Sequence, residues 1–506
     1  MSKALKNVGS NWVVTLGGVA VNYIITPFLI RTCGTEGYGI YMLIMSMAGY
    51  LSLLVLGVPM ASVRYFAEHV AKGDQEKLNE TIGSCVGLYT MLGAVAVLIG
   101  AGLFFIFIRS YTISPAWQWD SRLAFALQVL YVGIGFVTFL PEGIMHAHQD
   151  FVIRNVILLS ILVLRLVLTL AILRLVDSLA VLAAIQVVCL LTDFTVSYLV
   201  IKLRYRGLLF SFAKFRGAEV RRIFSFSLYV LLLYLGSRMF FYTSPIIIGA
   251  FMGISHIPFF SVANYFLVYL VEFVLGIAAV IMPAAARLMT QKRNSEVQEM
   301  FLKSSKILFA LTLYGGLFLI VLGPRFIAWW ISPSFEAPAG SVLQILVTSA
   351  LIYLPARGVA QPVLVGLGRV EVPALTCIAA GLINALLGAL LIKPFGLPGL
   401  AMAVAIPLVL MSIIVLVYAC RVLGVSLLTF LRYAVLRSSL GAVPVLALLM
   451  WLRNGWGVRS LEGLMGSFLM TALVFLAVGA FFVFRNDPYL DLFGQMRGLR
   501  LSRKPQ

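Results

Sequence analysis

Five ionisable residues interrupt long apolar stretches of this chain, and chemistry is expected at these positions. They are Arg165, Asp193, Arg238, Glu272 and Arg357. A charged side chain at the centre of a membrane helix costs roughly 2.5–3.5 kcal/mol on insertion scales, so each charge needs a reason. Three cations against two acids leave a net positive interior, which favours a ligand that carries an anionic group.

Polar and aromatic side chains recur at helical spacing on one face of four apolar stretches. These faces carry Asn22 in the first stretch, Gln128, Tyr131, Thr138 and Glu142 in the fourth, Tyr234, Arg238 and Tyr242 in the seventh, and Tyr269 and Glu272 in the eighth. Such faces line either a cavity suited to a phosphorylated sugar or a contact between packed helices. We favour a ligand-binding role for Arg238 and Glu272. Arg165 and Asp193 either bind ligand or neutralise each other.

Composition places the chain in the membrane. It is 61% hydrophobic and only 11% charged, whereas soluble proteins have about 25% charged residues. Its mean hydropathy is +1.03. Apolar runs long enough to cross a bilayer as helices recur along the chain. We therefore predict an all-α polytopic membrane protein with about fourteen transmembrane helices, at roughly 8–30, 38–59, 82–108, 122–144, 152–174, 178–200, 224–250, 257–283, 304–325, 341–366, 371–393, 398–420, 434–453 and 461–484.

Positive charge is distributed unevenly between the two sides of these spans. With the N-terminus inside, the cytoplasmic tails and loops hold 27 Lys and Arg, including Arg154, against 8 on the other side. This bias predicts that both termini are cytoplasmic. The net charge of +19 then reflects orientation and attraction to lipid headgroups, which argues against a nucleic-acid partner.

A segment of the first half recurs about 224 positions later. Each copy ends an apolar span with a proline and an arginine, followed by a charged loop: Pro59 with Arg64, and Pro283 with Arg287. An internal repeat in apolar sequence is typical of transporters with two related halves. We expect Arg64 and Arg287 to guard the cytoplasmic mouth.

Motifs for other chemistry are absent from the sequence. It has no Walker loop, no convincing dinucleotide fingerprint and no nucleophile motif, and its five cysteines are far apart, so we expect no enzyme activity, cofactor or metal site. The basic segment Lys202–Arg222 is either a linker or a docking site for pyrophosphate headgroups. His146 and His148 are either interfacial residues or proton relays.

The segments NWV to GTEGYGIY, GVPMASVRYFAEHVAKGDQEKLNETI and GLGRVEVPALTCIAAGLINALLGALLIKPFGLPGLAMAVAI carry a family resemblance. From about Lys6 to Arg421 the chain resembles the polysaccharide flippases and exporters of the multidrug/oligosaccharidyl-lipid/polysaccharide (MOP) superfamily, especially the Wzx-type O-antigen flippases. Lipid II flippases of this superfamily carry an Arg-Asp pair in the first span, where this chain has Asn22 and Thr26. The cation-coupled drug exporters rely on an N-lobe carboxylate, often in the first span, and here that span has none.

The resemblance implies two six-helix lobes around a cationic cavity. We expect an N-lobe at 1–203, a basic linker at 204–223, a C-lobe at 224–422, and two further helices with a cytoplasmic tail at 423–506. The implied activity is alternating-access transport of polyprenyl-pyrophosphate-linked oligosaccharide across the cytoplasmic membrane of a bacterium or archaeon. O-antigen, capsule, exopolysaccharide and teichuronic pathways all remain open.

Within that reading, Arg238, Arg357 and Arg165 are the residues we expect to hold the anionic headgroup. The alternative is a drug or metabolite antiporter driven by H⁺ or Na⁺. A third reading is a scaffold that partners a membrane-bound glycan polymerase and chain-length complex. The lipid-linked glycan, membrane lipid and the coupling ion are the partners these readings imply.

Overall fold

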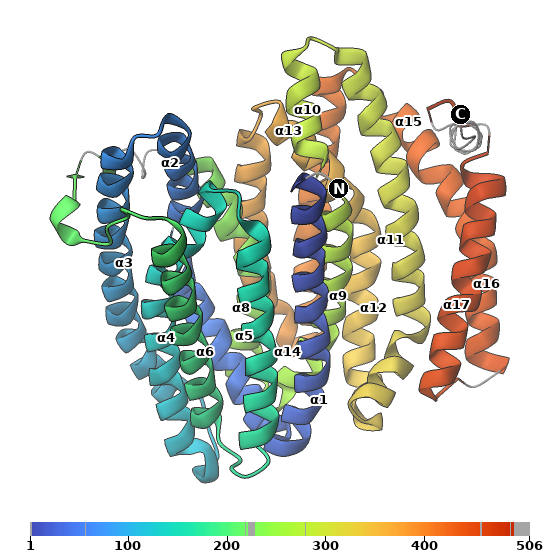
Figure 1. The fold of residues 1–506 in the computed structure, drawn as a ribbon. Coiled ribbons are helices and arrows are strands. Elements are labelled where there is room, and N and C mark those ends of the chain that lie inside the picture. The colour runs from blue at the N-terminus through green and yellow to red at the C-terminus, as the bar shows by residue number, and fades with distance from the viewer. Residues whose placement is uncertain are drawn as a thin grey trace, which may run out of the picture. The chain divides into compact units, whose positions relative to one another are not determined.

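The computed structural model describes residues 3–55, 57–217, 219–220, 228–278, 280–455, 458–485 and 487–489. Throughout these ranges the ordered elements are helices joined by turns, and none of the described residues forms a strand (Figure 1). The all-α class predicted from composition is confirmed.

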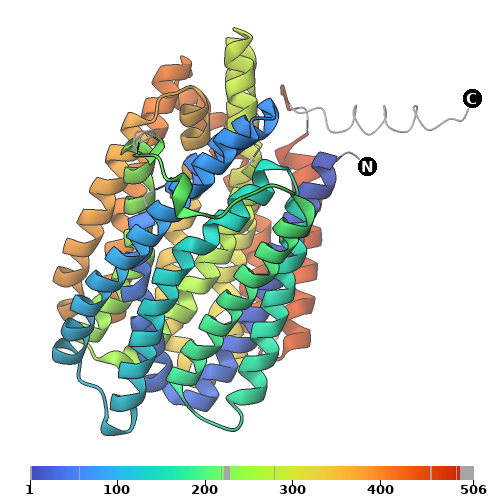
Figure 2. The same cartoon turned by 60° about the vertical axis from the view of Figure 1, so that its left-hand side comes forward.

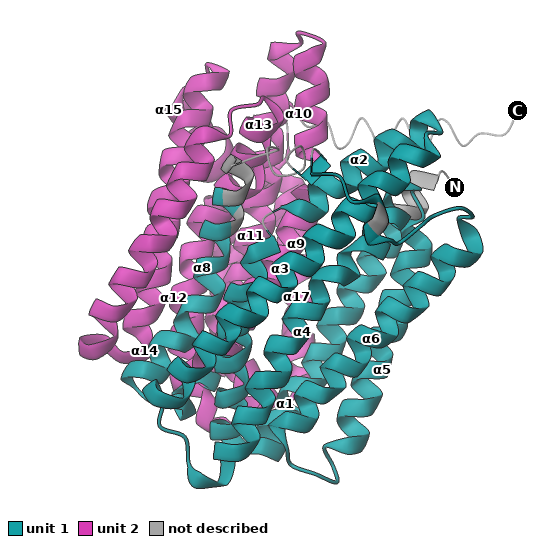
Figure 3. Ribbon diagram, turned by 90° about the vertical axis from the view of Figure 1, so that its left-hand side faces the viewer, with its two compact units in different colours: residues 1–258 teal, residues 259–506 magenta. Residues whose placement is uncertain are grey.

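The chain folds as two compact units, residues 1–258 and 259–506, which Figure 3 colours separately. Each unit is described by itself. The sequence placed the lobe boundaries at 203 and 224, and that division of the chain stays a prediction.

The first unit is built from long helices that turn back on one another (Figure 2). Its elements are α1 (Lys3–Leu51), η1 (Ser52–Val55), α2 (Val58–Lys72), α3 (Gln75–Ser110), α4 (Pro115–Ala147), α5 (Phe151–Ile172), α6 (Leu179–Arg204), η2 (Phe212–Lys214), α8 (Leu228–Phe251) and η3 (Ile254–His256). Ser178 caps α6 with its hydroxyl, and Asp74 caps α3 by accepting from the Lys77 N–H.

The second unit repeats long helices with short ones between them. From α9 (Ile257–Ala278), whose first two residues belong to the first unit, it continues through α10 (Ile281–Thr290), α11 (Asn294–Trp330), η4 (Pro333–Phe335), α12 (Glu336–Pro355), η5 (Ala356–Ala360), α13 (Gln361–Gly366), α14 (Glu371–Leu423), α15 (Leu427–Phe430), η6 (Leu431–Leu436), α16 (Arg437–Gly455), α17 (Leu461–Val478) and η7 (Gly479–Val483).

Two of the helices contain a break that the sequence anticipates. Gly34 in α1 has φ 69° and ψ −179°, and Gly396 in α14 has φ 60° and ψ −141°; only glycine adopts such angles readily. Eleven described helical stretches are long and apolar enough to cross a membrane. The two containing Gly34 and Gly396 span 64 and 53 residues, more than twice the ~20 that one crossing needs. The count of fourteen crossings stays a prediction.

The repeated proline–arginine segments form matching structures in the two units. Pro59 and Arg64 lie on the short helix α2, and Pro283 and Arg287 lie on the short helix α10. Each short helix ends in a tight turn that leads into a long helix, the 36-residue α3 or the 37-residue α11. The turns use positive φ at Gly73 (68°) and at Lys292 (57°).

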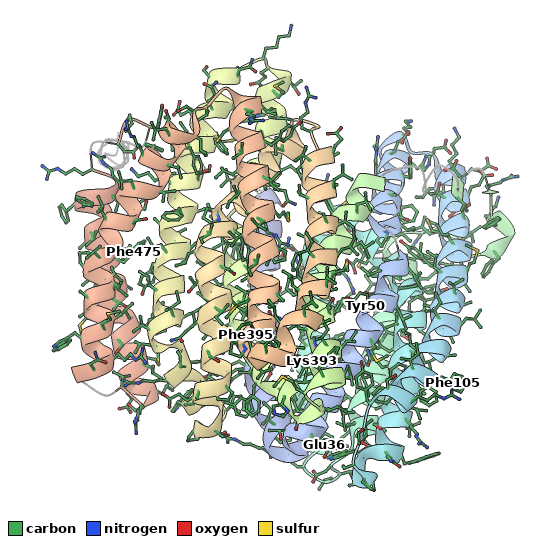
Figure 4. All side chains as sticks on the ribbon, turned by 180° about the vertical axis from the view of Figure 1, so that it is seen from behind. Glu36, Tyr50, Phe105, Lys393, Phe395 and Phe475 are labelled. Carbon is green, nitrogen blue, oxygen red and sulfur yellow. The ribbon has the colours of Figure 1, made fainter. Side chains whose placement is uncertain are left out.

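Large apolar side chains cover the outer flanks of the helices. Leu98 and Phe105 on α3 are 73% and 63% exposed, and Leu473 on α17 is 68% exposed. Phe105 projects from the flank of α3 in Figure 4. Apolar surface of this extent is stable against lipid rather than water. The chain is therefore a multi-pass membrane protein.

The helix α8 packs within the first unit because its side chains interlock with α1. The hydroxyls of Tyr50 and Thr243 share a hydrogen bond, and the Tyr50 and Tyr242 rings lie 5.9 Å apart. A Cβ at Gly49 would come within 2.6 Å of the Tyr242 ring, so the absent side chain leaves room for that ring. The helix α8 and the short η3 that follows it are therefore the last elements that lie wholly within the first unit.

Candidate functional site: a charged cavity in the first unit

A cavity of about 600 Å³ opens between α2, α4 and α8 of the first unit. This volume is within the range of small-molecule sites. Most of its wall is apolar, and its polar groups are few. The lining residues are Ser52, Leu53, Val55, Gly57, Pro59, Met60, Val63, Phe139, Glu142, Gly143, His146, Leu235 and Arg238.

Local backbone features bring these three helices to the cavity. Gly57 has φ 76°, which lets the chain leave η1 and start α2 with Pro59 in its first turn. On α4, Glu142 and His146 are four residues apart and so share one face. The His146 ring is held against Phe151, with ring centroids 4.7 Å apart.

Arg238 supplies the positive charge of the cavity, as the sequence proposed for a ligand-binding residue. Its side chain is exposed, and it donates a hydrogen bond from Nη1 to the Tyr242 hydroxyl at 3.2 Å. The guanidinium carbon lies 5.8 Å from the centre of the Tyr242 ring, close enough for a cation–π contact. Tyr242 in turn packs against Tyr50 of α1, which is labelled in Figure 4. The contact between the two tyrosines therefore helps to hold the Arg238 guanidinium in place.

Glu142 supplies the acidic group of the cavity, and a buried ion-pair network holds it. Its Oε2 accepts a hydrogen bond from Arg154 Nη2 at 3.2 Å. Arg154 also donates to both carboxylate oxygens of Asp193, with 3.0 Å between Nη2 and Oδ2, and to Ser197 at 3.1 Å. The Arg154 side chain is only 5% exposed and that of Asp193 12%, whereas that of Glu142 is 35% exposed. The network therefore presents one carboxylate to the cavity and buries the other.

The sequence left open whether Asp193 and Arg165 neutralise each other, and the ion pairs of Asp193 answer this question. Asp193 pairs with Arg154 at the start of α5 rather than with Arg165. Arg154, counted among the cytoplasmic loop charges, is instead buried between two carboxylates. Its place on the cytoplasmic side, like the charge bias itself, stays a prediction.

Other residues expected at the site lie elsewhere in the first unit. Arg165 is half-buried on α5, and its Nε is buried without a hydrogen-bond partner. Asn22 is half-buried on α1 and does not line the cavity. The Tyr234 side chain lies outside the described residues. His148 stacks on Tyr205 at 4.0 Å and bonds the Ile144 carbonyl through Nδ1, so it closes the end of α4.

The second unit carries the remaining candidates. Arg357 is half-buried on the π-turn Ala356–Ala360, which follows Pro355. Glu272 is exposed on α9, where Tyr269 is half-buried and stacks on Tyr265 at 6.2 Å. The pairing of Arg238 with Glu272 stays a prediction. Arg64 and Arg287 are exposed on α2 and α10, and their role at a cytoplasmic mouth also stays a prediction.

Comparison with known proteins fixes the family. Residues 4–289 match the family model described as polysaccharide biosynthesis protein, which is more than half of the chain. The chain belongs to this polysaccharide biosynthesis family. It is 27% identical over 138 residues to the uncharacterized membrane protein EpsK of Bacillus subtilis (strain 168), a match that spans 27% of this chain and 26% of the length of that relative.

Solved structures show that this polysaccharide biosynthesis protein has the fold of the MOP superfamily. An inward-facing multidrug resistance MATE transporter matches with a TM-score of 0.70 at 14% identity, over 79% of this chain and 94% of its own. The lipid II flippase MurJ in an inward closed conformation matches with a TM-score of 0.70 at 13% identity, over 92% and 97%. A MOP superfamily transporter from Pyrococcus furiosus matches at 0.61 and 14%, over 83% and 95%. The predicted resemblance is confirmed.

Only some of the residues at the cavity of this family member could be recognised from the sequence. Arg238, which lines the cavity, and Tyr242, which contacts it, were found because they interrupt apolar sequence at helical spacing. Glu142 was visible as the last residue of a polar face on α4, and His146 as a residue near the end of that helix, but neither was assigned to a site. Arg154 gave no signal, because a cation at a helix end resembles an ordinary loop charge.

Proposed function

We propose that the protein transports polyprenyl-pyrophosphate-linked oligosaccharide across the membrane by alternating access, and that the cavity of the first unit receives the head of that molecule. The observation that carries the proposal is the exposed Arg238 guanidinium in a cavity whose carboxylate, Glu142, is already bound by Arg154. The membership in the polysaccharide biosynthesis family supports the cargo class. A transport role, rather than catalysis, agrees with the fold.

The chemistry of the wall suits an amphiphile with an anionic sugar head. A guanidinium fork binds phosphate oxygens with two parallel N–H donors. The Glu142 carboxylate accepts hydrogen bonds from sugar hydroxyls. Apolar side chains such as Phe139 and Leu235 contact the less polar faces of a sugar ring or the first units of the prenyl chain.

A cation-coupled drug antiporter is the second candidate, and Glu142 is the observation that favours it. A carboxylate on a cavity wall attracts organic cations. In this cavity, however, Arg154 already compensates Glu142, and Arg238 repels a second cation. The charge balance therefore supports the glycan cargo.

The proposal is tested by replacing Arg238 in a strain whose surface glycan depends on this protein. Arg238→Ala should abolish glycan display while the protein remains at wild-type level in the membrane, because the headgroup loses its cation. Arg238→Lys should restore part of the display, since the charge returns without the planar fork. Arg109→Ala is the matched control: Arg109 is an exposed arginine at the end of α3 that does not line the cavity. Wild-type display by the Arg238→Ala strain would refute the site.

A further inference from the structure

The segment that follows α6 forms an ordered strap across α3. We call residues 205–217 the strap. It leaves α6 at Tyr205, which stacks on His148 and donates to Asp150, and then crosses to the first turns of α3 (Figure 2). The sequence left two readings of this basic stretch open, a linker or a docking site for pyrophosphate headgroups.

A groove on α3 receives the inner side of the strap. Asn79, Gly83 and Gly87 are spaced by four residues and share one face of α3. Asn79 donates from Nδ2 to the Gly207 carbonyl at 3.0 Å and accepts from the Leu209 N–H at 2.9 Å. A Cβ at Gly83 would come within 2.6 Å of the Ser211 carbonyl oxygen, and one at Gly87 within 2.7 Å of the Phe215 ring.

Polar contacts fasten the far end of the strap. The Arg216 N–H donates to Ser84 Oγ at 2.9 Å. The Arg216 guanidinium donates to Glu80 Oε1 from Nε at 3.1 Å and from Nη2 at 3.0 Å. Arg204, just before the strap, pairs with Asp150 at 2.9 Å. Two arginines of this basic stretch are therefore bound by carboxylates of the protein itself, which argues against their use as a headgroup clamp for a transported substrate.

The outer side of the strap has a different character. Leu209, Phe212 and Phe215 are 47%, 57% and 49% exposed, and Arg206, which precedes them in the strap, is also exposed. Three large apolar side chains on one short segment cost free energy in water, at roughly 25 cal/mol for each Å² of apolar area. The rings of Phe212 and Phe215 contact the Gly87 position of α3, and about half of each side chain remains exposed.

The position of the strap along the axis of α3 indicates what covers the exposed apolar side chains of the strap. It lies over residues 79–87, where the sequence of α3 changes from charged (Gln75–Glu80) to apolar (from Ile82 onward). A transition of this kind is typical of the boundary between headgroups and acyl chains. Apolar side chains with flanking cations are typical of segments that lie in this boundary.

We propose that the strap is an interfacial anchor: Leu209, Phe212 and Phe215 insert among the acyl chains, and Arg206 binds the headgroups of anionic phospholipid. The anchor fixes how deeply the first unit lies in the bilayer, at the point where the chain emerges from the bilayer after α6. This inference does not depend on the transported substrate.

Depth measurements on the whole protein in nanodiscs test the anchor. The five native cysteines are buried, so a thiol-reactive spin label will report an introduced cysteine. With Phe212→Cys, we expect the label to be relaxed by oxygen and protected from a water-soluble nickel chelate. With Glu76→Cys, at an exposed position in the first turn of α3, the label should show the reverse. Equal access of the nickel chelate to both positions would refute insertion, and protection of Phe212→Cys from both reagents would show a protein contact instead.

The lipid class is tested with a fluorophore at the same cysteine and brominated lipids. In nanodiscs that contain equal fractions of phosphatidylglycerol and phosphatidylcholine, brominated phosphatidylglycerol should quench the fluorophore more strongly. Arg206→Gln should weaken that preference about fivefold, which corresponds to about 1 kcal/mol for one basic residue at an anionic surface. Equal quenching by the two lipids in the parent protein would refute the role of anionic headgroups.

Discussion

Lys306 and Asp487 form an ion pair from which water is excluded, with 2.5 Å between Nζ and Oδ2 and neither side chain exposed. The Tyr433 hydroxyl donates to the other carboxylate oxygen at 2.6 Å, and the Lys306 ammonium lies 4.8 Å from the Tyr433 ring. Lys306 belongs to α11, while Asp487 follows η7 at the end of the described chain. The pair thus attaches the segment after α17 to a central helix of the second unit.

The first prediction is that this pair stabilises the second unit. Lys306→Ala should lower the free energy of unfolding by about 3–5 kcal/mol, because it leaves a buried carboxylate without its cation. The double variant Lys306→Met, Asp487→Leu should recover much of that loss, because no buried charge remains. The measurement is thermal unfolding of the purified protein. Lys72→Ala, which breaks the exposed pair with Glu68, is the control and should change little. Equal stability of Lys306→Ala and wild type would refute the role of the pair.

The second prediction concerns the pH dependence of the same pair. Burial opposes ionisation of Asp487, but hydrogen bonds from Lys306, Tyr433 and the Tyr489 N–H outweigh it and lower the pKa of this carboxyl. A lowered pKa adds stability above the unfolded value of about 3.9, and this stability is lost as the pH falls through the folded value. The melting temperature of wild type should therefore fall on acidification below about pH 4 more steeply than that of Asp487→Asn. Parallel curves would contradict this linkage.

Much of the fold could be predicted from residue types alone, because apolar length and glycine position are local properties. Gly34 lies between the predicted spans 8–30 and 38–59, and the structure breaks α1 there. Pro59 and Pro283 were recognised as counterparts, and both lie in short helices before a long one. These features need no knowledge of which helices touch.

The parts that could not be predicted depend on contacts between distant segments. Asp193 selects Arg154, 39 residues away, rather than Arg165, 28 away on the same helix as Arg154. Either arginine could be aligned with Asp193 from helical phase alone, and only the packing of α5 on α6 decides. The attachment of α8 to the first unit likewise depends on Tyr50, 193 residues from Thr243.

The third prediction concerns orientation. Lys292 and Ser334 are exposed residues in the turns that flank the 37-residue helix α11, whose length of roughly 55 Å exceeds the bilayer. If the charge bias sets the orientation, Lys292→Cys should be protected from an impermeant thiol reagent in intact cells and Ser334→Cys should react. After lysis both should react, which controls for accessibility. Labelling of Lys292→Cys before lysis would reverse the orientation and with it the cytoplasmic termini.

The fourth prediction orders three changes in the network behind the cavity. Arg154→Ala should be the most destabilising, by about 3–5 kcal/mol, because two carboxylates then lack a buried partner. Asp193→Asn should cost less, because Arg154 keeps Glu142, but it should also reduce glycan export per molecule of protein. The reason is that Arg154 then neutralises Glu142 more completely and weakens it as an acceptor for sugar hydroxyls. Asp193→Glu should restore export. An unchanged export rate per molecule in Asp193→Asn would limit the network to a structural role.

The fifth prediction separates the two candidate transport functions through their acidic residues. Glu142 lines the cavity of the first unit and Glu272 is exposed on α9, so a cation antiporter would depend on one or both carboxylates. For a glycan cargo, Glu142→Gln keeps the shape and a hydrogen-bonding oxygen, so export should weaken without vanishing, and Glu272→Gln should matter only as far as Glu272 orients Arg238. Sensitivity to cationic drugs should not change in either strain. Glycan display and drug sensitivity, measured in the same cells, distinguish a glycan transporter from a cation antiporter. Lost drug resistance with intact glycan display would identify an antiporter, because only an organic cation requires the negative charge that both substitutions remove.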